Sequence, residues 1–278
     1  MRGGFAKQTR TPPAGAIETD PFSLFSRFFK KSSPSEQTTA RASARVPAGT
    51  RVYAVGDVHG RSDLYDQVAE WVASDLASDS IPAVTIFLGD YVDRGRDSSG
   101  VLERLSSGAF PTEITTLSGN HEEMLLKFLD DESQLDSWRR YGGLETLHSY
   151  GVSVADVMRG QNFDVARDEL AARLPNKHLD FLKNLSLTAE IGDYYFCHAG
   201  VRPGVALADQ ESADLLWIRG EFLNHPDSFG KRVVHGHTPV EKPELRANRI
   251  NIDTGAFVTG ALTCVALDDD RVRFFTTK

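Results

Sequence analysis

From residue 51 onward, short apolar runs alternate with segments in which apolar residues recur every three or four positions. The runs at 51–55, 83–90 and 113–120 have the length of buried strands, and each lies beside a glycine. A helix is predicted after the first run, because helical spacing relates Leu64, Val68, Trp71, Val72 and Leu76. This alternation predicts an α/β domain.

The rest of the chain continues the alternation after a helical stretch. Residues 121 to about 190 are predicted to be mostly helical, with breaks at residues 142–143, Gly151 and Pro175. Strands are then predicted at 193–200, 232–238 and 249–255, followed by a closing hairpin at 261–275. An aspartate-rich turn lies at the centre of this hairpin. No internal repeat is present.

The first 48 residues differ in composition from the remainder. They are rich in Ser, Thr, Pro, Ala and Gly, which predicts a disordered or loosely attached tail before a domain at 49–278. Within the tail, residues 20–31 carry Phe22, Phe25 and Phe29 at helical spacing among basic residues. This segment is interpreted either as a short helix that docks on a membrane or protein partner, or as aromatics packed on the domain.

Charge is distributed unevenly along the chain. The net charge is −8, but residues 1–50 carry +5 and the remainder carries −13. A body this acidic argues against general nucleic-acid binding, which requires a positive surface. No apolar stretch has membrane-spanning length. The only two cysteines, Cys197 and Cys264, are predicted to be core residues, and a reducing, cytoplasmic location is expected.

One short pattern recurs five times along the chain. A strand ends, a glycine follows, and side chains able to ligate metals lie beside it. The instances are GDVHG (56–60), GDYVDRG (89–95), GNHE (119–122), HAG (198–200) and HGHT (235–238). Turns alone do not require Asp and His, whereas mixed oxygen and nitrogen ligands suit manganese, iron or zinc. The five motifs together therefore predict a metal site.

These motifs resemble those of the metallophosphoesterase superfamily, and GDYVDRG with GNHE resembles its phosphoprotein phosphatase branch. The chain is most similar to the bacterial and lambda phage serine/threonine phosphatases, over roughly residues 50–270. The resemblance implies the calcineurin-like fold, an α/β four-layer αββα sandwich of two packed mixed β-sheets flanked by helices. Because the chain lacks the tyrosine-containing loop of the eukaryotic enzymes, sensitivity to their toxins is not implied.

The resemblance also implies a site for two divalent metal ions, with manganese expected and iron or zinc as alternatives. Two such ions, about 3.5–4 Å apart, lower the pKa of a bridging water and deliver hydroxide in line to phosphorus. Asp90 would bridge the ions, and His235 is an alternative to His237 that better suits a strand-end packing role. The implied ligands are Asp57, His59, Asp90, Asn120, His198 and His237.

The resemblance assigns four further residues to catalysis. His121 would protonate the leaving oxygen, and Asp93 would hold the imidazole in the required tautomer. Arg94 would bind phosphoryl oxygens through its planar fork. Arg219 in LLWIRGEF resembles the second phosphate-binding arginine, with Arg61 and Arg202 as alternatives. The leucines and the tryptophan of this segment are predicted to be core residues.

These assignments imply a phosphatase acting on phosphoserine or phosphothreonine in proteins. The alternative is a symmetrical diadenosine tetraphosphatase, a group that typically has Ala where this chain has Asp93 and Pro after the position of Gly95. A more remote alternative is an inactive scaffold that uses the fold for binding. Such proteins usually lose metal ligands, whereas every ligand position is filled here. Fold alone does not fix the substrate.

Overall fold

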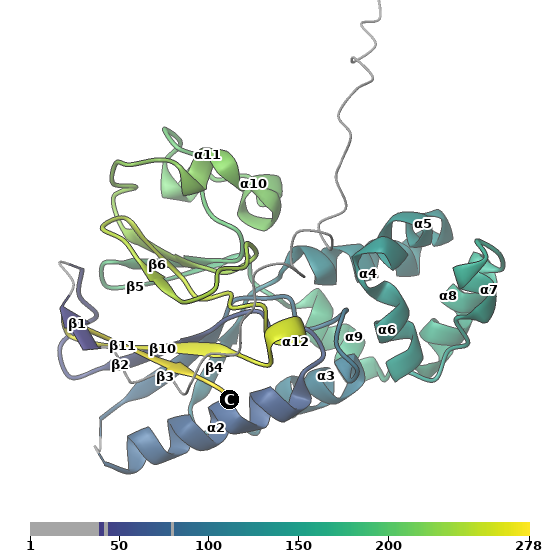
Figure 1. Cartoon of the computed structure of the whole chain (residues 1–278), viewed down its shortest axis with the longest axis horizontal. Coiled ribbons are helices and arrows are strands. Elements are labelled where there is room, and N and C mark those ends of the chain that lie inside the picture. The colour runs from purple at the N-terminus through teal and green to yellow at the C-terminus, as the bar shows by residue number, and fades with distance from the viewer. Residues whose placement is uncertain (1–38, 42–43, 79–80) are drawn as a thin grey trace, which may run out of the picture. The chain divides into compact units, whose positions relative to one another are not determined.

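Two β-sheets form the centre of the domain (Figure 1). The computed structural model describes residues 39–41, 44–78 and 81–278. The first sheet has six strands in the order β1-β11-β10-β2-β3-β4, and the second has five in the order β5-β6-β7-β9-β8. The first sheet comprises β1 (Thr39–Arg41), β2 (Arg51–Val55), β3 (Ala83–Phe87), β4 (Glu113–Thr116), β10 (Thr263–Asp268) and β11 (Arg271–Thr276). The second comprises β5 (Thr188–Ile191), β6 (Tyr194–Cys197), β7 (Arg232–His235), β8 (Glu244–Leu245) and β9 (Arg249–Asn251).

Each sheet contains three neighbouring parallel strands. Strand β3 lies parallel to both β2 and β4, and β7 lies parallel to both β6 and β9. The remaining pairings are antiparallel, so both sheets are mixed. The carboxyl ends of parallel strands meet at one edge of a sheet, where ligands bind in open α/β folds.

The apolar runs reflect strands that are buried on both faces. Along β2, Val52 and Ala54 face the core between the sheets, whereas Tyr53 and Val55 face the helices. In β6, Phe196 likewise joins the inter-sheet core, and Cys197 joins a separate core under the outer helices. Because successive strand residues point to opposite faces, each run contributes to two cores and has no polar alternation.

Helices cover the outer faces of both sheets (Figure 1). Helices α2 and α3 pack on the first sheet, and α10 and α11 pack on the second. The helices outside the stretch between β4 and β5 are α2 (Ser62–Ala77), α3 (Ser98–Ser107), η3 (Leu207–Asp209), α10 (Ser212–Trp217), α11 (Gly220–Leu223) and α12 (Ala256–Thr259). The four-layer αββα sandwich is therefore confirmed.

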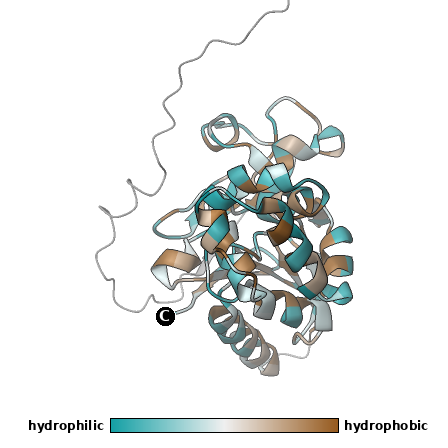
Figure 2. Ribbon diagram, turned by 90° about the vertical axis from the view of Figure 1, so that its right-hand side faces the viewer, coloured by the Kyte–Doolittle hydropathy of each residue, from teal (hydrophilic) through white to brown (hydrophobic). Residues whose placement is uncertain are grey.

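The helical stretch between β4 and β5 forms one side of the domain (Figure 1). Figure 2 shows hydrophilic and hydrophobic residues mixed along these helices, as expected for elements with one buried face. The elements are α4 (Asn120–Asp130), η1 (Glu132–Gln134), α5 (Leu135–Trp138), η2 (Arg139–Tyr141), α6 (Gly143–Ser149), α7 (Ala155–Met158), α8 (Phe163–Arg173) and α9 (Asn176–Lys183). The prediction of a mostly helical segment here is confirmed.

The folded domain begins earlier than the predicted boundary at residue 49. Strand β1 pairs with β11, so residues 39–41 are part of the first sheet. Ala44 and Val46 are buried in the inter-sheet core, which short apolar residues can join even in a polar stretch. The predicted docking segment at 20–31 lies outside the described residues. Across the described parts of the chain, no helix has the length and apolar character needed to cross a membrane.

Candidate metal centre and acid dyad

The predicted ligands all follow parallel strands, three strands of the first sheet and two of the second. Asp57 and His59 follow β2, Asp90 follows β3, and Asn120 follows β4. His198 follows β6, and His237 follows β7. The topology therefore brings residues that are up to 180 positions apart to one edge of the sandwich. Direct contacts between residues of the two sheets show that the two edges meet there.

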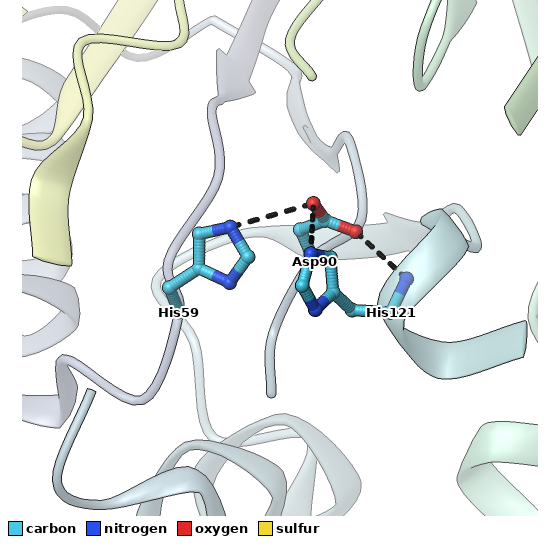
Figure 3. A group of neighbouring side chains, drawn as sticks. All are labelled: His59, Asp90 and His121. Atoms are coloured by element: carbon cyan, nitrogen blue, oxygen red, sulfur yellow. Dashed lines mark hydrogen bonds and ion pairs between the residues drawn. The ribbon is translucent and has the colours of Figure 1, made fainter. Parts of the chain in front are cut away.

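A first cluster surrounds the carboxylate of Asp90 (Figure 3). Its Oδ2 lies 3.4 Å from Nε2 of His59 and 3.8 Å from Nε2 of His121, so the two imidazoles point at one oxygen. Its Oδ1 accepts a hydrogen bond from the backbone N–H of His121. All three side chains are buried.

A second cluster uses the other oxygen of the same carboxylate. Nε2 of His198 lies 3.4 Å from Asp90 Oδ1 and 2.9 Å from Asn120 Oδ1. Nδ1 of His237 lies 2.8 Å from the same Asn120 oxygen. Asp90 thus belongs to both clusters, as a carboxylate shared by two metal ions would.

Asp57 lies against the backbone of the second sheet. Its Oδ2 accepts a hydrogen bond from the backbone N–H of His237 at 3.0 Å, while its Oδ1 is buried without a hydrogen-bond partner. Burial raises the pKa of Asp57, and the charges of Asp253 and Asp90 raise it further. A buried carboxylate oxygen of this kind is costly unless a proton or a cation compensates it.

The protonation of the imidazoles fits metal ligation. Nδ1–H of His59 donates to the carbonyl of Val92, and Nδ1–H of His198 donates to that of Leu88. Their Nε2 atoms therefore carry lone pairs, as ligands oriented through the other ring nitrogen do. Burial is the main influence lowering the pKa of His59, His198 and His237, which favours the neutral ligating form.

The donor set as a whole fits divalent metal ions. Nε2 of His198 lies close to Asn120 Oδ1 and Asp90 Oδ1, and in the neutral imidazole this nitrogen has no proton to donate to them. Three lone pairs therefore face one another, which a cation between them would stabilise. His237 Nε2 and Asp57 Oδ1 are buried without hydrogen-bond partners. Burial acts to raise the pKa of Asp90, but the surrounding imidazoles outweigh it and hold the pKa below its usual value. Mixed nitrogen and oxygen ligands suit manganese, iron or zinc.

His121 forms a buried pair with Asp93. Its Nδ1 lies 2.6 Å from Asp93 Oδ2, which leaves Nε2 directed toward Asp90 without a hydrogen-bond partner. The helical segment holds the carboxylate in place: Trp138 Nε1 donates to Oδ2 at 2.7 Å, and Thr146 Oγ1 donates to Oδ1 at 2.6 Å. An imidazole oriented by a carboxylate is an arrangement suited to general acid catalysis.

Arg94 lies beside the first cluster. Its Nη1 lies 3.1 Å from Nε2 of His59, and its guanidinium lies over the ring of Phe257. Among the described residues, no ion pair joins Arg94 to a carboxylate. Its charge is therefore available to an anion.

Arg219 is exposed and donates to Thr238 Oγ1 at 3.3 Å. Partial desolvation by the surrounding protein lowers the pKa of Arg219, and the charge of Arg94 lowers it further, whereas the charge of Asp253 opposes both. Arg202 and Arg61, the alternatives for the second phosphate-binding arginine, are both paired with acidic groups. Arg202 pairs with Asp214 and Glu221, and Arg61 pairs with Asp63. This pairing favours Arg219 as the second guanidinium near the cluster.

The packing roles predicted for His235 and Trp217 have different outcomes. His235 is buried and belongs to neither cluster; its ring packs on Phe222, and its Nε2 lies 3.3 Å from Nη1 of Arg249. Burial lowers the pKa of His235 to about 3, consistent with a packing role. Trp217, predicted to be core, is only half-buried: it donates to Glu123 and lies 6.2 Å from His237 between ring centroids.

Two buried carboxylates beside the clusters, Glu122 and Asp253, were not among the predicted site residues. Glu122 accepts hydrogen bonds from the backbone N–H groups of residues 90, 91, 92 and 119, which joins the loops that carry Asp90 and Asn120. Burial and the Asp90 charge raise the pKa of Glu122 to about 8, against the effect of those donors.

The second missed residue, Asp253, is buried beyond β9, and burial raises its pKa to about 6. It also follows a strand and lies two residues before Gly255, at the third parallel strand of the second sheet. A strand followed by an aspartate with a glycine close behind is the sequence signal that indicates it.

Backbone strain is concentrated in the site. Seven described residues other than glycine have positive φ, and five of them are His59, Asp90, Asp93, Arg94 and His237. Such conformations cost on the order of 1–3 kcal/mol each for non-glycine residues and cluster at functional sites. Two motif glycines make room for ligand carboxylates: a Cβ on Gly119 would lie 2.1 Å from Asp90 Oδ1, and one on Gly236 would lie 2.0 Å from Asp57 Oδ1.

Comparisons with known proteins agree with this geometry. A family model described as calcineurin-like phosphoesterase matches residues 50–260. The asymmetrical bis(5′-nucleosyl)-tetraphosphatase PrpE of Anoxybacillus flavithermus is 25% identical over 64% of this chain and 73% of its own length. Serine/threonine-protein phosphatase 2 of Escherichia coli is 26% identical over 76% of this chain and 90% of its own. A solved structure provisionally identified as a diadenosine tetraphosphatase has a TM-score of 0.58 at 18% identity, over 84% of this chain and 99% of that one.

Proposed function

Because this chain belongs to the calcineurin-like phosphoesterase family, we propose that it is a phosphatase that hydrolyses phosphoserine and phosphothreonine in proteins. Two divalent metal ions, with manganese as the resident metal, would be held by Asp57, His59, Asp90, Asn120, His198 and His237. Bound ions of this kind lower the pKa of a water and supply a nucleophile at neutral pH.

The observation that carries this proposal is the buried pair of His121 and Asp93 next to the shared carboxylate. The oxygen of a serine or threonine side chain is a poor leaving group, so its departure requires a proton. His121 would donate that proton from Nε2, which is free of other partners, while Asp93 holds Nδ1. A phosphate leaving group from a nucleotide needs less protonation, and an acid dyad contributes less to its departure.

Two guanidinium groups would hold the phosphoryl oxygens that the metals do not contact. Arg94 contributes a charge without a carboxylate partner, and Arg219 lies between α10 and α11, the helices that cover the second sheet. Hydrolysis transfers a phosphoryl group whose oxygens must be neutralised and kept in line, a task suited to the planar fork of arginine.

The test uses the purified full chain, stripped with EDTA and then supplied with Mn²⁺. Turnover would be measured in parallel on p-nitrophenyl phosphate, a panel of phosphoserine, phosphothreonine and phosphotyrosine peptides, and diadenosine tetraphosphate. We expect manganese-dependent turnover with the highest kcat/KM on phosphoserine or phosphothreonine peptides. Full activity after EDTA treatment, or a higher kcat/KM on diadenosine tetraphosphate, would contradict the proposal.

A second candidate function is hydrolysis of dinucleoside tetraphosphates. It is favoured by the similarity to PrpE proteins, several of which match this chain at 23–25% identity. These relatives are the asymmetrical type, whereas the sequence had suggested the symmetrical type as the alternative. Product analysis separates the two, because asymmetrical cleavage of diadenosine tetraphosphate yields ATP and AMP, and symmetrical cleavage yields two ADP.

The remaining proposals concern location and partners. A cytoplasmic location is proposed because Cys197 and Cys264 are both buried free thiols, which suits a reducing compartment. The proposed partner is a phosphorylated protein rather than a nucleic acid, given the acidic charge of the domain. Docking of residues 20–31 on a membrane or a protein stays a prediction, which co-sedimentation of the full chain with anionic vesicles would test.

A further inference from the structure

The guanidinium of Arg94 is held without an acidic partner. Its backbone N–H donates to the carbonyl of Gly142 at 3.1 Å, and its Nε donates weakly to the carbonyl of Tyr141 at 3.4 Å. Neither contact fixes the far end of the side chain, which carries the nitrogens that would meet a phosphoryl group. A long, flexible side chain loses conformational entropy when it is ordered, so something must hold this end in place.

The contact of Nη1 with His59 cannot serve that purpose in a metal-loaded site. The lone pair of His59 Nε2 accepts from Arg94 at 3.1 Å. The same lone pair is the one that His59 would offer to a metal ion, because its Nδ1–H already donates to Val92. One lone pair cannot serve both, so another contact must hold Arg94.

That contact is the ring of Phe257. The guanidinium carbon of Arg94 lies 4.9 Å from the ring centroid, within the range of a cation–π interaction. The same ring meets His59 edge-on, with centroids 5.5 Å apart and an interplanar angle of 81°. Phe257 therefore lies against both the proposed phosphate-binding residue and a proposed ligand of the first metal.

The backbone around Phe257 is well fixed. It belongs to the single turn α12, which is bounded by Gly255 and Gly260, both in the left-handed region. Arg61 Nη1 donates to the carbonyl of Ala256 at 2.9 Å, and Thr259 Oγ1 donates to the carbonyl of Thr254. Ala256 is itself buried. A ring presented by so constrained a turn can restrict the position of a flexible partner.

We propose that Phe257 is a positioning residue, whose ring face holds the Arg94 guanidinium where it meets the phosphoryl oxygens of the substrate. The inference rests on the phosphate-binding role given to Arg94 under the proposed function. It explains why Arg94 needs no carboxylate partner: an aromatic face orients a guanidinium without neutralising its charge. It also assigns a function to α12, which carries no predicted site residue.

The experiment compares four variants of the manganese-loaded full chain. Phe257→Ala removes the ring, Phe257→Leu keeps apolar volume without the aromatic face, and Phe257→Tyr keeps the face. Val258→Ala, at the exposed neighbouring position of the same turn, is the matched control. The readouts are kcat and KM on p-nitrophenyl phosphate, the affinity for inorganic phosphate measured by calorimetry, bound metal and the denaturant midpoint.

We expect Phe257→Ala and Phe257→Leu to lose roughly 3- to 30-fold in kcat/KM and to bind inorganic phosphate more weakly by a similar factor. Phe257→Tyr and Val258→Ala should resemble the parent, and bound metal should not change. In an Arg94→Ala background, Phe257→Ala should have less than a twofold further effect, because the ring acts through the arginine.

Full activity and full phosphate affinity in Phe257→Leu would overturn the inference. It would also be overturned if Phe257→Ala caused the same fold loss in the Arg94→Ala background as in the parent. If Phe257→Ala lowers the denaturant midpoint strongly, the comparison of Leu with Tyr decides, since both keep a large side chain. A parent protein that lacks turnover would instead count against the proposed function. The calorimetric arm then still tests whether Phe257 supports phosphate binding.

Discussion

The substitution Trp138→Phe tests how far the helical segment controls the acid dyad. Trp138 is fully buried, and its Nε1–H donates to Asp93 Oδ2 at 2.7 Å, on the same oxygen that meets His121. Its ring packs on Phe128 with centroids 5.1 Å apart. Phenylalanine keeps an aromatic ring in this contact but removes the hydrogen-bond donor.

The expected loss of stability has two parts. A hydrogen bond to a charged, buried group contributes about 1.5–3 kcal/mol to folding. The smaller ring also loses apolar contact comparable to about two methylene groups, or about 1.6 kcal/mol. The free energy of unfolding should therefore fall by about 3–5 kcal/mol, which denaturant titration measures as a lower midpoint at unchanged slope.

Kinetics separate the hydrogen bond from packing. With one donor fewer, Asp93 holds His121 less firmly, so turnover of alkyl phosphates should fall by about tenfold and turnover of p-nitrophenyl phosphate by less. Phe128→Leu is the matched control, because it removes buried volume from the same ring pair without touching Asp93. If both variants show the same kinetics, Trp138 acts only in packing. An unchanged midpoint in Trp138→Phe would refute the energetic reasoning.

The remaining predictions concern the shared carboxylate, the acid dyad, the two arginines and the N-terminal segment. Asp90→Asn should abolish turnover and reduce metal at both positions, and two full metal equivalents with normal turnover would disprove a shared ligand. His121→Asn should lower turnover of alkyl phosphates by roughly 10²–10⁴-fold, with a smaller loss on p-nitrophenyl phosphate, whereas equal losses argue against acid catalysis. Arg94→Lys should recover little of the activity lost in Arg94→Ala, and Arg219→Ala should weaken inhibition by inorganic phosphate unless Arg219 only forms surface contacts. Deleting residues 1–38 should leave turnover on p-nitrophenyl phosphate unchanged, whereas deleting 1–48 should lower the unfolding midpoint, because it removes Ala44 and Val46 from the inter-sheet core.

Much of the sandwich could be predicted because its central strands are apolar on both faces. The runs that contain Val52, Ile86 and Phe196 are recognisable as buried strands from their composition alone. The edges of the sheets could not be predicted in this way. Strand β1 has three residues and β8 has two, which is too short for a recognisable pattern of apolar residues. Their positions depend on pairing with β11 and β9, respectively, which local sequence does not reveal.

The residues of the candidate site stand out in the sequence one by one, but the contacts between them do not. Asp57, Asp90 and His237 stand out because they follow strands and lie beside glycines. Trp138 and Thr146 carry no such signal, since a tryptophan and a threonine in amphipathic helices ordinarily indicate packing and solvent contact. Their link to Asp93 arises only when the helical segment folds back over the GDYVDRG loop.

The left-handed backbone at five site residues sets the free energy of folding against the proposed chemistry in the choice of residue at each position. Glycine tolerates these dihedral angles without the steric penalty that His59, Asp93 and Arg94 incur. A selection for thermostability alone would therefore tend to accept glycine at these positions, and each such substitution would remove a proposed metal ligand, a proposed dyad member or a proposed phosphate-binding group. A stability-ranked library of this chain should be enriched in inactive members at these positions, so engineering for stability should keep them fixed and draw its gains from the outer helices.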